Sequence, residues 1–511
     1  MSPAQFQSHP HRLSKSRAVA GWRCPRYLWW KVHKADAPEL RPSLADRDRM
    51  EQGTAVGKLA TRRFPGGVEI EYAPDELDRM ARETRAALNA GAPAVFEASF
   101  MEDDVFVAVD ILERLDPEQS TDAFRLIEVK ATSSPKDEHI PDAAVQLHVL
   151  RNAGVEVREV ALMHLNRDYR HPGPEDLFAL TDITAQAEAF QPEVPALLAS
   201  CREVLQGAGP GPLMGDRCTR FHCPLTEVCW PREPDHVRRL NGVGLKKALA
   251  HMEAGVHTFG DLGPEARIGD KARRQLESWR AGGLKVEETL KDDLRPFRGR
   301  LGFLDFETIM RAVPPWDGLA PYEQVPVQFS YHERQADGTV THTEWLAPGP
   351  GDPRKPLAEA LVRAARDADA VVTYTGYEKR CIRALQDAAP ELALELDRLL
   401  SRLLDLEKVV GRNLAHPDFM GKTSIKYVLT PLVPELSYEG MEVADGMAAS
   451  VRLARLILGE GALAPENAPT SEDPLSPEAR EAERRALLDY CKLDTLAMVR
   501  LLERLEGLAG I

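Results

Sequence analysis

The chain has 511 residues, of which 43% are hydrophobic, 28% charged and 6% aromatic, a composition that excludes a disordered or fibrous protein. This length exceeds what one hydrophobic core usually organises, so at least two large domains are expected. The formal net charge of -15 excludes a uniformly basic surface but not local basic patches. Because the sequence has neither an apolar run of roughly 20 residues nor a signal peptide, we expect a cytoplasmic protein with no membrane partner.

The N-terminal segment is both basic and aromatic. Residues 12–34 include no acid but four aromatic side chains, Trp22, Tyr27, Trp29 and Trp30. They also include seven basic residues: Arg12, Lys15, Arg17, Arg23, Arg26, Lys31 and Lys34. Such a segment could hold a single-stranded nucleic acid by charge and stacking. The alternative is a solvated, partly packed helix, although the neighbouring Cys24 favours a functional role.

Two apolar runs, 105–110 and 124–130, have the alternation and β-branched residues of adjacent strands. Asp110 ends the first run, and Glu128 and Lys130 end the second. Because alternate strand residues share a face, these three side chains are expected in one patch. Carboxylates bind Mg²⁺ or Mn²⁺, the bound ion activates water, and a lysine can orient that water. The patch therefore indicates a candidate catalytic metal site.

Two other polar residues could join this patch. Glu97 lies one predicted strand upstream, and Gln146 opens an apolar helical stretch downstream. Both could reach the same cation or a DNA backbone. For an isolated motif of this kind, a salt-bridge cluster at strand ends is the alternative interpretation.

Four of the seven cysteines bracket this region. Cys24 precedes it, and Cys218, Cys223 and Cys229 follow it. A cytoplasmic compartment keeps thiols reduced, which favours a metal or cluster site over disulfides. Four thiolates suit zinc or a 4Fe-4S cluster. One lone cysteine with a trio differs from the two close pairs usual for structural zinc and favours iron-sulfur.

Taken in chain order, these motifs resemble the RecB-family PD-(D/E)XK nucleases with an iron-sulfur staple, which include the CRISPR-adaptation nucleases and the AddB helicase-nuclease subunits. The motifs are Cys24-Pro25-Arg26, Asp110, Glu128-Val129-Lys130, Gln146 and the trio Cys218, Cys223 and Cys229. The resemblance covers roughly residues 12–232 and implies a restriction-endonuclease-like domain over residues 1–232. It also implies a metal held by Asp110 and Glu128, and a 4Fe-4S cluster held by the four cysteines.

This chain departs from the family pattern at two places. The first family motif usually carries a histidine, but Gln52–Gly57 contains none, and Leu150 stands where a tyrosine usually follows Gln146. These departures predict reduced metal affinity or activity.

A short connecting module is predicted at residues 233–295. Leu240–Lys247 and Gly255–Leu262 resemble a helix-hairpin-helix, whose turns present backbone N–H groups and lysines to phosphates. A plain packing hairpin would explain the same glycines. Contact with DNA is expected here mainly from the position of the module between two nuclease-like domains.

A second set of acids lies in the C-terminal region, residues 296–511. Leu301–Thr308 is an apolar strand whose Asp305 and Glu307 share one face. Far downstream, Tyr490 and Asp494 share one face of a predicted helix. Three acids can bridge two metal ions, and a phenol can orient the attacking water. A scaffold of salt bridges is the less economical alternative.

These residues resemble the DnaQ-like exonucleases of RNase H-like, mixed-sheet fold. Glu378 stands where that family carries a further Asp, and Asp405 is a possible auxiliary acid. Ser424-Ile425-Lys426 resembles the Ser-x-Lys stretch of related domains, and the C-terminal half resembles an uncharacterised bacterial domain usually attached to RecB-like nucleases. Because Glu is longer than Asp by one methylene, weakened metal geometry is expected in this domain.

The sequence therefore predicts an α/β multidomain, Mg²⁺- or Mn²⁺-dependent nuclease that degrades DNA from ends or single strands, in repair or phage defence. No phosphate-binding loop of a motor is present, so a helicase or defence-system partner would supply unwinding. Two alternatives stay open: a catalytically degenerate DNA-binding or assembly component with a structural cluster, and a nuclease directed at RNA.

Overall fold

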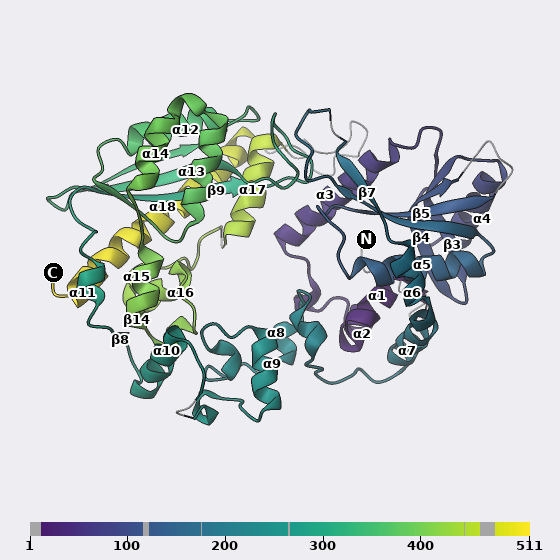
Figure 1. The fold of residues 1–511 in the computed structure, drawn as a ribbon, viewed down its shortest axis with the longest axis horizontal. Coiled ribbons are helices and arrows are strands. Elements are labelled where there is room, and N and C mark those ends of the chain that lie inside the picture. The colour runs from purple at the N-terminus through teal and green to yellow at the C-terminus, as the bar shows by residue number, and fades with distance from the viewer. Residues whose placement is uncertain (1–11, 116–121, 175, 264–265, 444, 460–475) are drawn as a thin grey trace. The chain divides into compact units, whose positions relative to one another are not determined.

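The structure is a computed structural model, and it describes residues 12–115, 122–174, 176–263, 266–443, 445–459 and 476–511 (Figure 1). The protein is an α/β protein with mixed sheets and many helices, as the sequence predicts. It divides into two compact units. Among the described residues, those up to Pro231 together with Arg311–Tyr322 form unit 1, and the others form unit 2. No helix in the described part of the chain has the length and apolarity needed to cross a membrane.

Unit 1 is built on a seven-stranded sheet in the order β2-β3-β4-β5-β6-β7, with β1 paired to β4. The neighbours β5 and β6 are parallel, and helix α5 connects them. The strands are β1 (Leu13–Ser14), β2 (Val68–Glu69), β3 (Ala94–Glu102), β4 (Val105–Arg114), β5 (Ala123–Lys130), β6 (Glu156–Leu165) and β7 (Phe178–Asp182). Both apolar runs that the sequence predicts as strands, in β4 and β5, are confirmed as adjacent antiparallel strands.

Helices cover both faces of this sheet, which explains why its central strands are apolar nearly throughout. One core joins β4 and β5 to α1, α4, α5 and α7, and a second core joins the opposite face to α3. The helices are α1 (Lys15–Arg23), α2 (Pro25–His33), α3 (Leu44–Thr61), α4 (Leu77–Asn89), α5 (His139–Asn152), α6 (Thr184–Phe190), α7 (Val194–Gln206) and α8 (Thr226–Cys229).

Unit 1 also takes a segment from the C-terminal half of the chain, Arg311–Tyr322. The Arg311 guanidinium lies 2.7 Å from Asp48 of α3, and both side chains are largely buried. Ala312 donates its N–H to Gln52 at 2.7 Å, and the Tyr322 hydroxyl donates to the carbonyl of Ala131, just after β5, at 2.6 Å. Unit 1 is therefore not one continuous stretch of chain.

Unit 2 is built on a five-stranded mixed sheet in the order β11-β10-β9-β12-β13. The strands β9, β10 and β11 are antiparallel, whereas β12 runs parallel to β9 and β13 runs parallel to β12. The strands are β9 (Leu301–Ile309), β10 (Val325–Arg334), β11 (Val340–Leu346), β12 (Ala370–Thr373) and β13 (Leu403–Asp405). The predicted strand at Leu301–Thr308 is thus confirmed.

Helices pack on both faces of the unit 2 sheet (Figure 1). One core joins β9 and β10 to α12, α13 and α14, and the other joins the opposite face to α15, α16 and the long α18. The helices are α12 (Arg354–Ala364), α13 (Tyr377–Ala388), α14 (Ala393–Ser401), α15 (Leu406–Asn413), α16 (Ile425–Leu432), α17 (Gly446–Leu458) and α18 (Pro477–Leu508).

The connecting region belongs to unit 2 and has a small hydrophobic core of its own. Its strand β8 (Lys285–Val286) pairs with β14 (Leu414–Ala415). Its helices are α9 (Leu245–Glu253), α10 (Asp270–Ala281) and α11 (Leu290–Asp293). Asn241 donates to the carbonyl of Gly421 at 2.7 Å. A side chain at Gly421 would meet the carbonyl oxygen of Arg239 at 2.1 Å, so this close approach requires glycine.

Candidate metal centres

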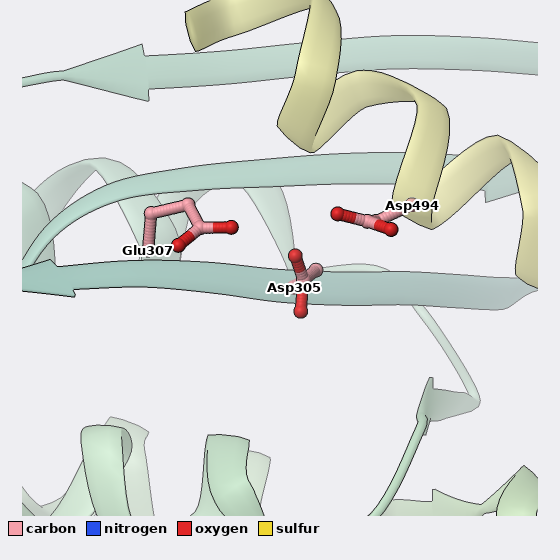
Figure 2. Close-up of side chains that lie close together, drawn as sticks. All are labelled: Asp305, Glu307 and Asp494. Atoms are coloured by element: carbon pink, nitrogen blue, oxygen red, sulfur yellow. The ribbon is translucent and has the colours of Figure 1, made fainter. Parts of the chain in front are cut away.

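The acids of unit 2 converge from two elements. Asp305 and Glu307 are alternate residues of β9, and Asp494 projects from α18 toward them (Figure 2). One carboxylate oxygen of each lies within 4.8 Å of the others. In the described part of the chain, this is the one group of three or more acidic, histidine or cysteine ligands that is so close. We refer to it as the unit 2 centre.

A buried polar network fixes α18 in register with the sheet. Thr495, next to Asp494, makes hydrogen bonds of 2.7 Å with the Ser330 hydroxyl and with Nδ1 of His332, both on β10. All three side chains are buried, so breaking these bonds would leave unsatisfied polar groups. The network therefore positions Asp494 opposite β9.

Burial and mutual repulsion disfavour the ionised forms of the three acids in the unit 2 centre. Burial, followed by the charges of neighbouring acids, holds the pKa values of Asp305 and Glu307 well above their usual range. Burial also raises the pKa of Asp494 to about 6, against the lowering effects of the Tyr438 hydrogen bond and of Lys426. Because a divalent cation would offset this repulsion, these three acids suit Mg²⁺ or Mn²⁺.

Two phenols and a lysine adjoin the three acids. Tyr490 precedes Asp494 by one turn of α18 and is buried. The Tyr438 hydroxyl donates to Oδ1 of Asp494 at 2.5 Å. The Lys426 ammonium lies 5.2 Å from the Tyr438 ring centre and 5.1 Å from that of Tyr490. Sequence patterns do not predict the role of Tyr438, because it lies in no motif. Lys426, by contrast, belongs to the Ser-x-Lys stretch.

Glu378 and Asp405 differ in their relation to the unit 2 centre. Glu378 is buried in the first turn of α13, and its Oε2 has no hydrogen-bond partner among the described residues. Burial, then the charge of Asp305, raises its pKa well above the usual range. It is therefore close enough to interact with the centre. Asp405 caps α15, where its carboxylate accepts from the N–H of Lys408 at 3.3 Å, and its charge also raises the pKa of Glu378.

Two cysteines outside the predicted thiol cluster lie beside the unit 2 centre. Cys491 is buried with its Sγ 3.6 Å from Oδ2 of Asp305. Cys381 follows Glu378 by one turn of α13. Burial, then the charges of Glu378 and Asp305, raises the pKa of its thiol. The sequence signal that could have placed these cysteines near the centre is their closeness to Tyr490 and Glu378 on the same two helices.

The predicted patch of unit 1 is brought together on β4, β5 and α5. The Lys130 ammonium lies 2.5 Å from Oε1 of Glu128 and 2.8 Å from Asp142. Gln146, in the middle of α5, donates a hydrogen bond of 2.7 Å to Oε2 of Glu128. Asp110 accepts the N–H of Val129 at 2.7 Å. We refer to these residues, with Lys15 and Glu97 described next, as the unit 1 centre.

The most distinctive contact in unit 1 comes from the first residue of α1. The ammonium of Lys15 lies 3.6 Å from Oδ1 of Asp110 and 3.1 Å from Oε2 of Glu128. Burial alone would lower the pKa of Lys15, but Asp110, Glu128 and Asp142 together raise it well above its usual range. The sequence placed Lys15 only within a basic run, with no sign that it faces these acids.

Glu97 joins the unit 1 centre through an unusual backbone. It has a φ of 53° within β3, a left-handed conformation that disfavours side chains other than glycine. Burial, then the charge of Asp110, raises its pKa to about 7, and burial, then Glu128, raises that of Asp110 to about 6. Strained residues of this kind cluster at functional sites.

The four cysteines of the predicted cluster also come together. Cys24 lies between α1 and α2, Cys218 lies in a short 3-10 turn, and Cys229 ends α8. All four are free thiols of intermediate exposure. Burial raises the pKa of Cys223, and the charges of the other three raise it further. Four thiols in one place have the donor chemistry of a metal or iron-sulfur site.

The spacing of these thiols bears on which group they suit. Four sulfurs around one zinc ion at about 2.3 Å would lie about 3.8 Å apart. No three of the described cysteines have sulfurs within 4.8 Å of one another. In any three of these described cysteines, at least one pair of sulfurs is therefore farther apart than two sulfurs on one bound zinc ion.

The basic and aromatic N-terminal segment is largely engaged within unit 1. Arg23 pairs with Glu138 at 2.7 Å, Arg26 donates to the carbonyl of Pro210 at 2.8 Å, and Trp30 is buried. Lys34 lies over Trp30 at 4.4 Å. These contacts favour the packed-helix interpretation over a free surface for stacking bases.

One family model matches part of the chain. Residues 302–424 match the family described as "Domain of unknown function (DUF2779)". The match contains Asp305, Glu307 and Glu378 and ends before Tyr490 and Asp494. It covers less than half of the chain, and the family description names no activity. Comparisons with curated proteins and with solved structures gave no match.

Proposed function

We propose that this protein is a Mg²⁺- or Mn²⁺-dependent nuclease that hydrolyses DNA phosphodiester bonds, with unit 2 acting as a DnaQ-like exonuclease of RNase H-like fold. The convergence of Asp305, Glu307 and Asp494 within 4.8 Å carries this proposal. Three partly buried acids with raised pKa values form a site that suits cations, and a pair of divalent ions about 4 Å apart is the standard way to cleave a phosphodiester in line.

In unit 2, each neighbouring side chain has a role in this chemistry. Asp305, Glu307 and Asp494 would hold the metal, which supplies a nucleophilic hydroxide and neutralises charge on the phosphate. The Tyr438 hydrogen bond fixes the orientation of Asp494. The Tyr490 phenol is placed to orient the attacking water. Glu378 takes the role of the further family acid, and its free Oε2 is available to a ligand.

We further propose that unit 1 is a RecB-like PD-(D/E)XK domain. Asp110 and Glu128 would hold a divalent ion, Gln146 keeps Glu128 in place through its 2.7 Å hydrogen bond, and Lys130 orients water. The crossover from β5 through α5 to the parallel β6 supports this proposal. The absence of the usual motif histidine and tyrosine predicts weaker cleavage here than in unit 2.

The thiol cluster is proposed to bind a 4Fe-4S group through Cys24, Cys218, Cys223 and Cys229. Their positions near the two ends of the continuous part of unit 1 support a role as a staple. Such a group would contribute to folding stability by joining segments that are distant in sequence.

DNA ends or single strands are the proposed substrate, with a helicase or defence-system protein as partner. The turn Gly242–Gly244 before α9, with exposed Lys246 and Lys247, supports phosphate contact in the helix-hairpin-helix manner. RNA is the alternative substrate, because RNase H-like domains act on either polymer.

The test is Mn²⁺-dependent digestion of end-labelled single- and double-stranded DNA, and of matched RNA, by anaerobically purified protein. We expect Asp305→Asn to abolish the principal activity and the double variant Asp305→Asn, Glu128→Gln to abolish all cleavage. Asp292→Asn, which alters an exposed acid of unit 2, is the matched control. Full activity in the double variant would contradict the proposal, and binding without cleavage by the wild type would favour a degenerate DNA-binding component.

A further inference from the structure

Lys15 is the basic residue of the N-terminal segment that enters an acidic centre. We propose that its ammonium group acts as a built-in second cation of the unit 1 centre, so that this centre takes one divalent ion, and takes it more weakly than the acids alone would. This inference rests on the proposed metal-binding function of unit 1 and assigns a positioning and selectivity role to a residue outside the family motifs that the sequence shows.

The geometry places the Lys15 ammonium where a shared counter-ion must lie. It is 3.1 Å and 3.2 Å from the two carboxylate oxygens of Glu128 and 3.6 Å from Asp110. The exposed fractions of the side chains are 22% for Lys15 and 1% for Glu128. The contact is thus shielded from water, and solvent screens it less than a surface ion pair.

The fold holds Lys15 in this position from both sides. Before it, the buried Leu13 and Ser14 form β1 and pair with β4, the strand that carries Asp110. After it, α1 begins with a cap in which the Ser14 hydroxyl accepts from the N–H of Arg17 at 3.3 Å. The buried Ala18 and the tight contact of Gly21 with Cys201 fix the rest of α1. The backbone position of Lys15 is therefore fixed, and its side chain needs only to extend from α1 to reach the two acids.

The charges of the centre explain why this matters for metal binding. Four carboxylates, those of Glu97, Asp110, Glu128 and Asp142, face two ammonium groups, Lys15 and Lys130. When all are ionised the balance is two negative charges, which one divalent ion neutralises. A second divalent ion would leave excess positive charge in a buried site. An ion bound between Asp110 and Glu128 also feels repulsion from the nearby Lys15.

The experiment measures binding of Mn²⁺ alone to the full-length protein. The parent for all variants is Asp305→Asn, Asp494→Asn, which removes the unit 2 centre. The free Mn²⁺ concentration is followed by electron paramagnetic resonance during a titration. In the parent we expect one bound ion that Glu128→Gln removes. Lys15→Met should tighten its binding by about tenfold or more because the repulsion is lost.

Two comparisons separate a charge effect from a structural one. Lys15→Arg keeps the positive charge and should keep the parent affinity, whereas Lys15→Gln, a neutral polar variant, should bind as tightly as Lys15→Met. Lys58→Met, at an exposed lysine of α3, is the matched control and should change nothing. Because all variants are compared in Mn²⁺ affinity, a loss of thermal stability alone would not reproduce this order.

The outcomes distinguish the inference from the function on which it rests. Glu128-dependent binding of equal or lower affinity in both Lys15→Met and Lys15→Gln would overturn the role of Lys15 and leave the metal centre intact. The absence of any Glu128-dependent Mn²⁺ binding in parent and variants would overturn the proposed metal centre of unit 1, and the inference with it.

Discussion

The two centres solve the same problem, the burial of several carboxylates, in opposite ways. In unit 1, lysines lie within ion-pair distance of the acids: Lys15 contacts Asp110 and Glu128, and Lys130 contacts Glu128 and Asp142. In unit 2, the acids adjoin one another and are lined by phenols and thiols, and their pKa values are raised. In the first centre, two lysines offset half of the charge of the four carboxylates, whereas in the second the raised pKa values of Asp305 and Glu307 indicate strong repulsion among the acids.

The prediction with the largest expected effect concerns the ion pairs of the unit 1 centre. Glu128→Gln leaves Lys15 and Lys130 without their shared buried partner, and the free energy of unfolding should fall by roughly 3 kcal/mol. Denaturant unfolding in the presence of a chelator measures this free energy. The control is Glu188→Gln, which alters an exposed ion pair of unit 1. An equal effect of the two substitutions would show that the lysines do not depend on Glu128.

The second prediction tests the unit 2 centre through pH. Asp494 has its pKa raised to about 6 in the folded protein, against about 3.9 when unfolded. The unfolded state therefore releases this proton first, and metal-free protein loses stability as pH rises from about 4 to above 6. Asp494→Asn should remove about 2 kcal/mol of that loss after allowing for partial solvent exposure.

The measurement is the thermal unfolding midpoint in chelator at pH 4 and pH 8. The wild type should lose more stability between these values than Asp494→Asn does. If the unfolding midpoints of the two proteins depend on pH in the same way, the raised pKa of Asp494 is contradicted. Mn²⁺ at pH 8 should restore stability to the wild type and not to the variant.

A third prediction concerns the helix that delivers Lys15. A methyl group at Gly21 would lie 2.3 Å from Sγ of Cys201. Overpacking of this kind costs about 1–3 kcal/mol, so Gly21→Ala should unfold at lower denaturant. Adding Cys201→Ala should recover most of the loss, since it removes the clashing sulfur. Failure of the second substitution to rescue the first would mean that α1 does not pack as described.

The prediction with the smallest expected effect concerns Tyr438, which lies outside every motif. Tyr438→Phe removes the hydroxyl that donates to Asp494. A hydrogen bond to a charged group contributes about 1.5 kcal/mol, which predicts roughly a tenfold loss of cleavage by unit 2. The substitution leaves unit 1 untouched, so the assay uses a Glu128→Gln parent. Unchanged cleavage would show that Asp494 is positioned without this phenol.

Local patterns predicted the strands and the helix of both centres because each depends on a few neighbouring residues. Val105–Asp110 alternates as a strand must, and Asp305 and Glu307 share a face by strand geometry alone. Tyr490 and Asp494 follow in the same way from helix spacing. What spacing could not reveal was tertiary: the contact of Lys15 with Glu128 joins residues more than a hundred positions apart.

The same limit applies to the partners of the unit 2 acids. Tyr438 and Cys491 are ordinary residues in sequence. The packing of α18 against β9 brings Cys491 to Asp305, and the segment between α16 and α17 brings Tyr438 to Asp494. Asp405 stays a possible auxiliary acid. Its carboxylate caps the first turn of α15, and its charge also contributes to the raised pKa of Glu378. The local pattern for a helix cap and for a metal ligand is the same.

The segment Arg311–Tyr322 has a consequence for synthesis of the protein. Because its Arg311 pairs with Asp48 and its Tyr322 bonds to Ala131, unit 1 cannot complete its packing until residue 322 has left the ribosome. A gene fragment that stops near residue 231 would lack these contacts and would leave the Asp48 carboxylate without its ion-pair partner, with only the hydrogen bond from Gln52. Nascent unit 1 therefore gains these contacts only after β9, a strand of the unit 2 sheet, has been made.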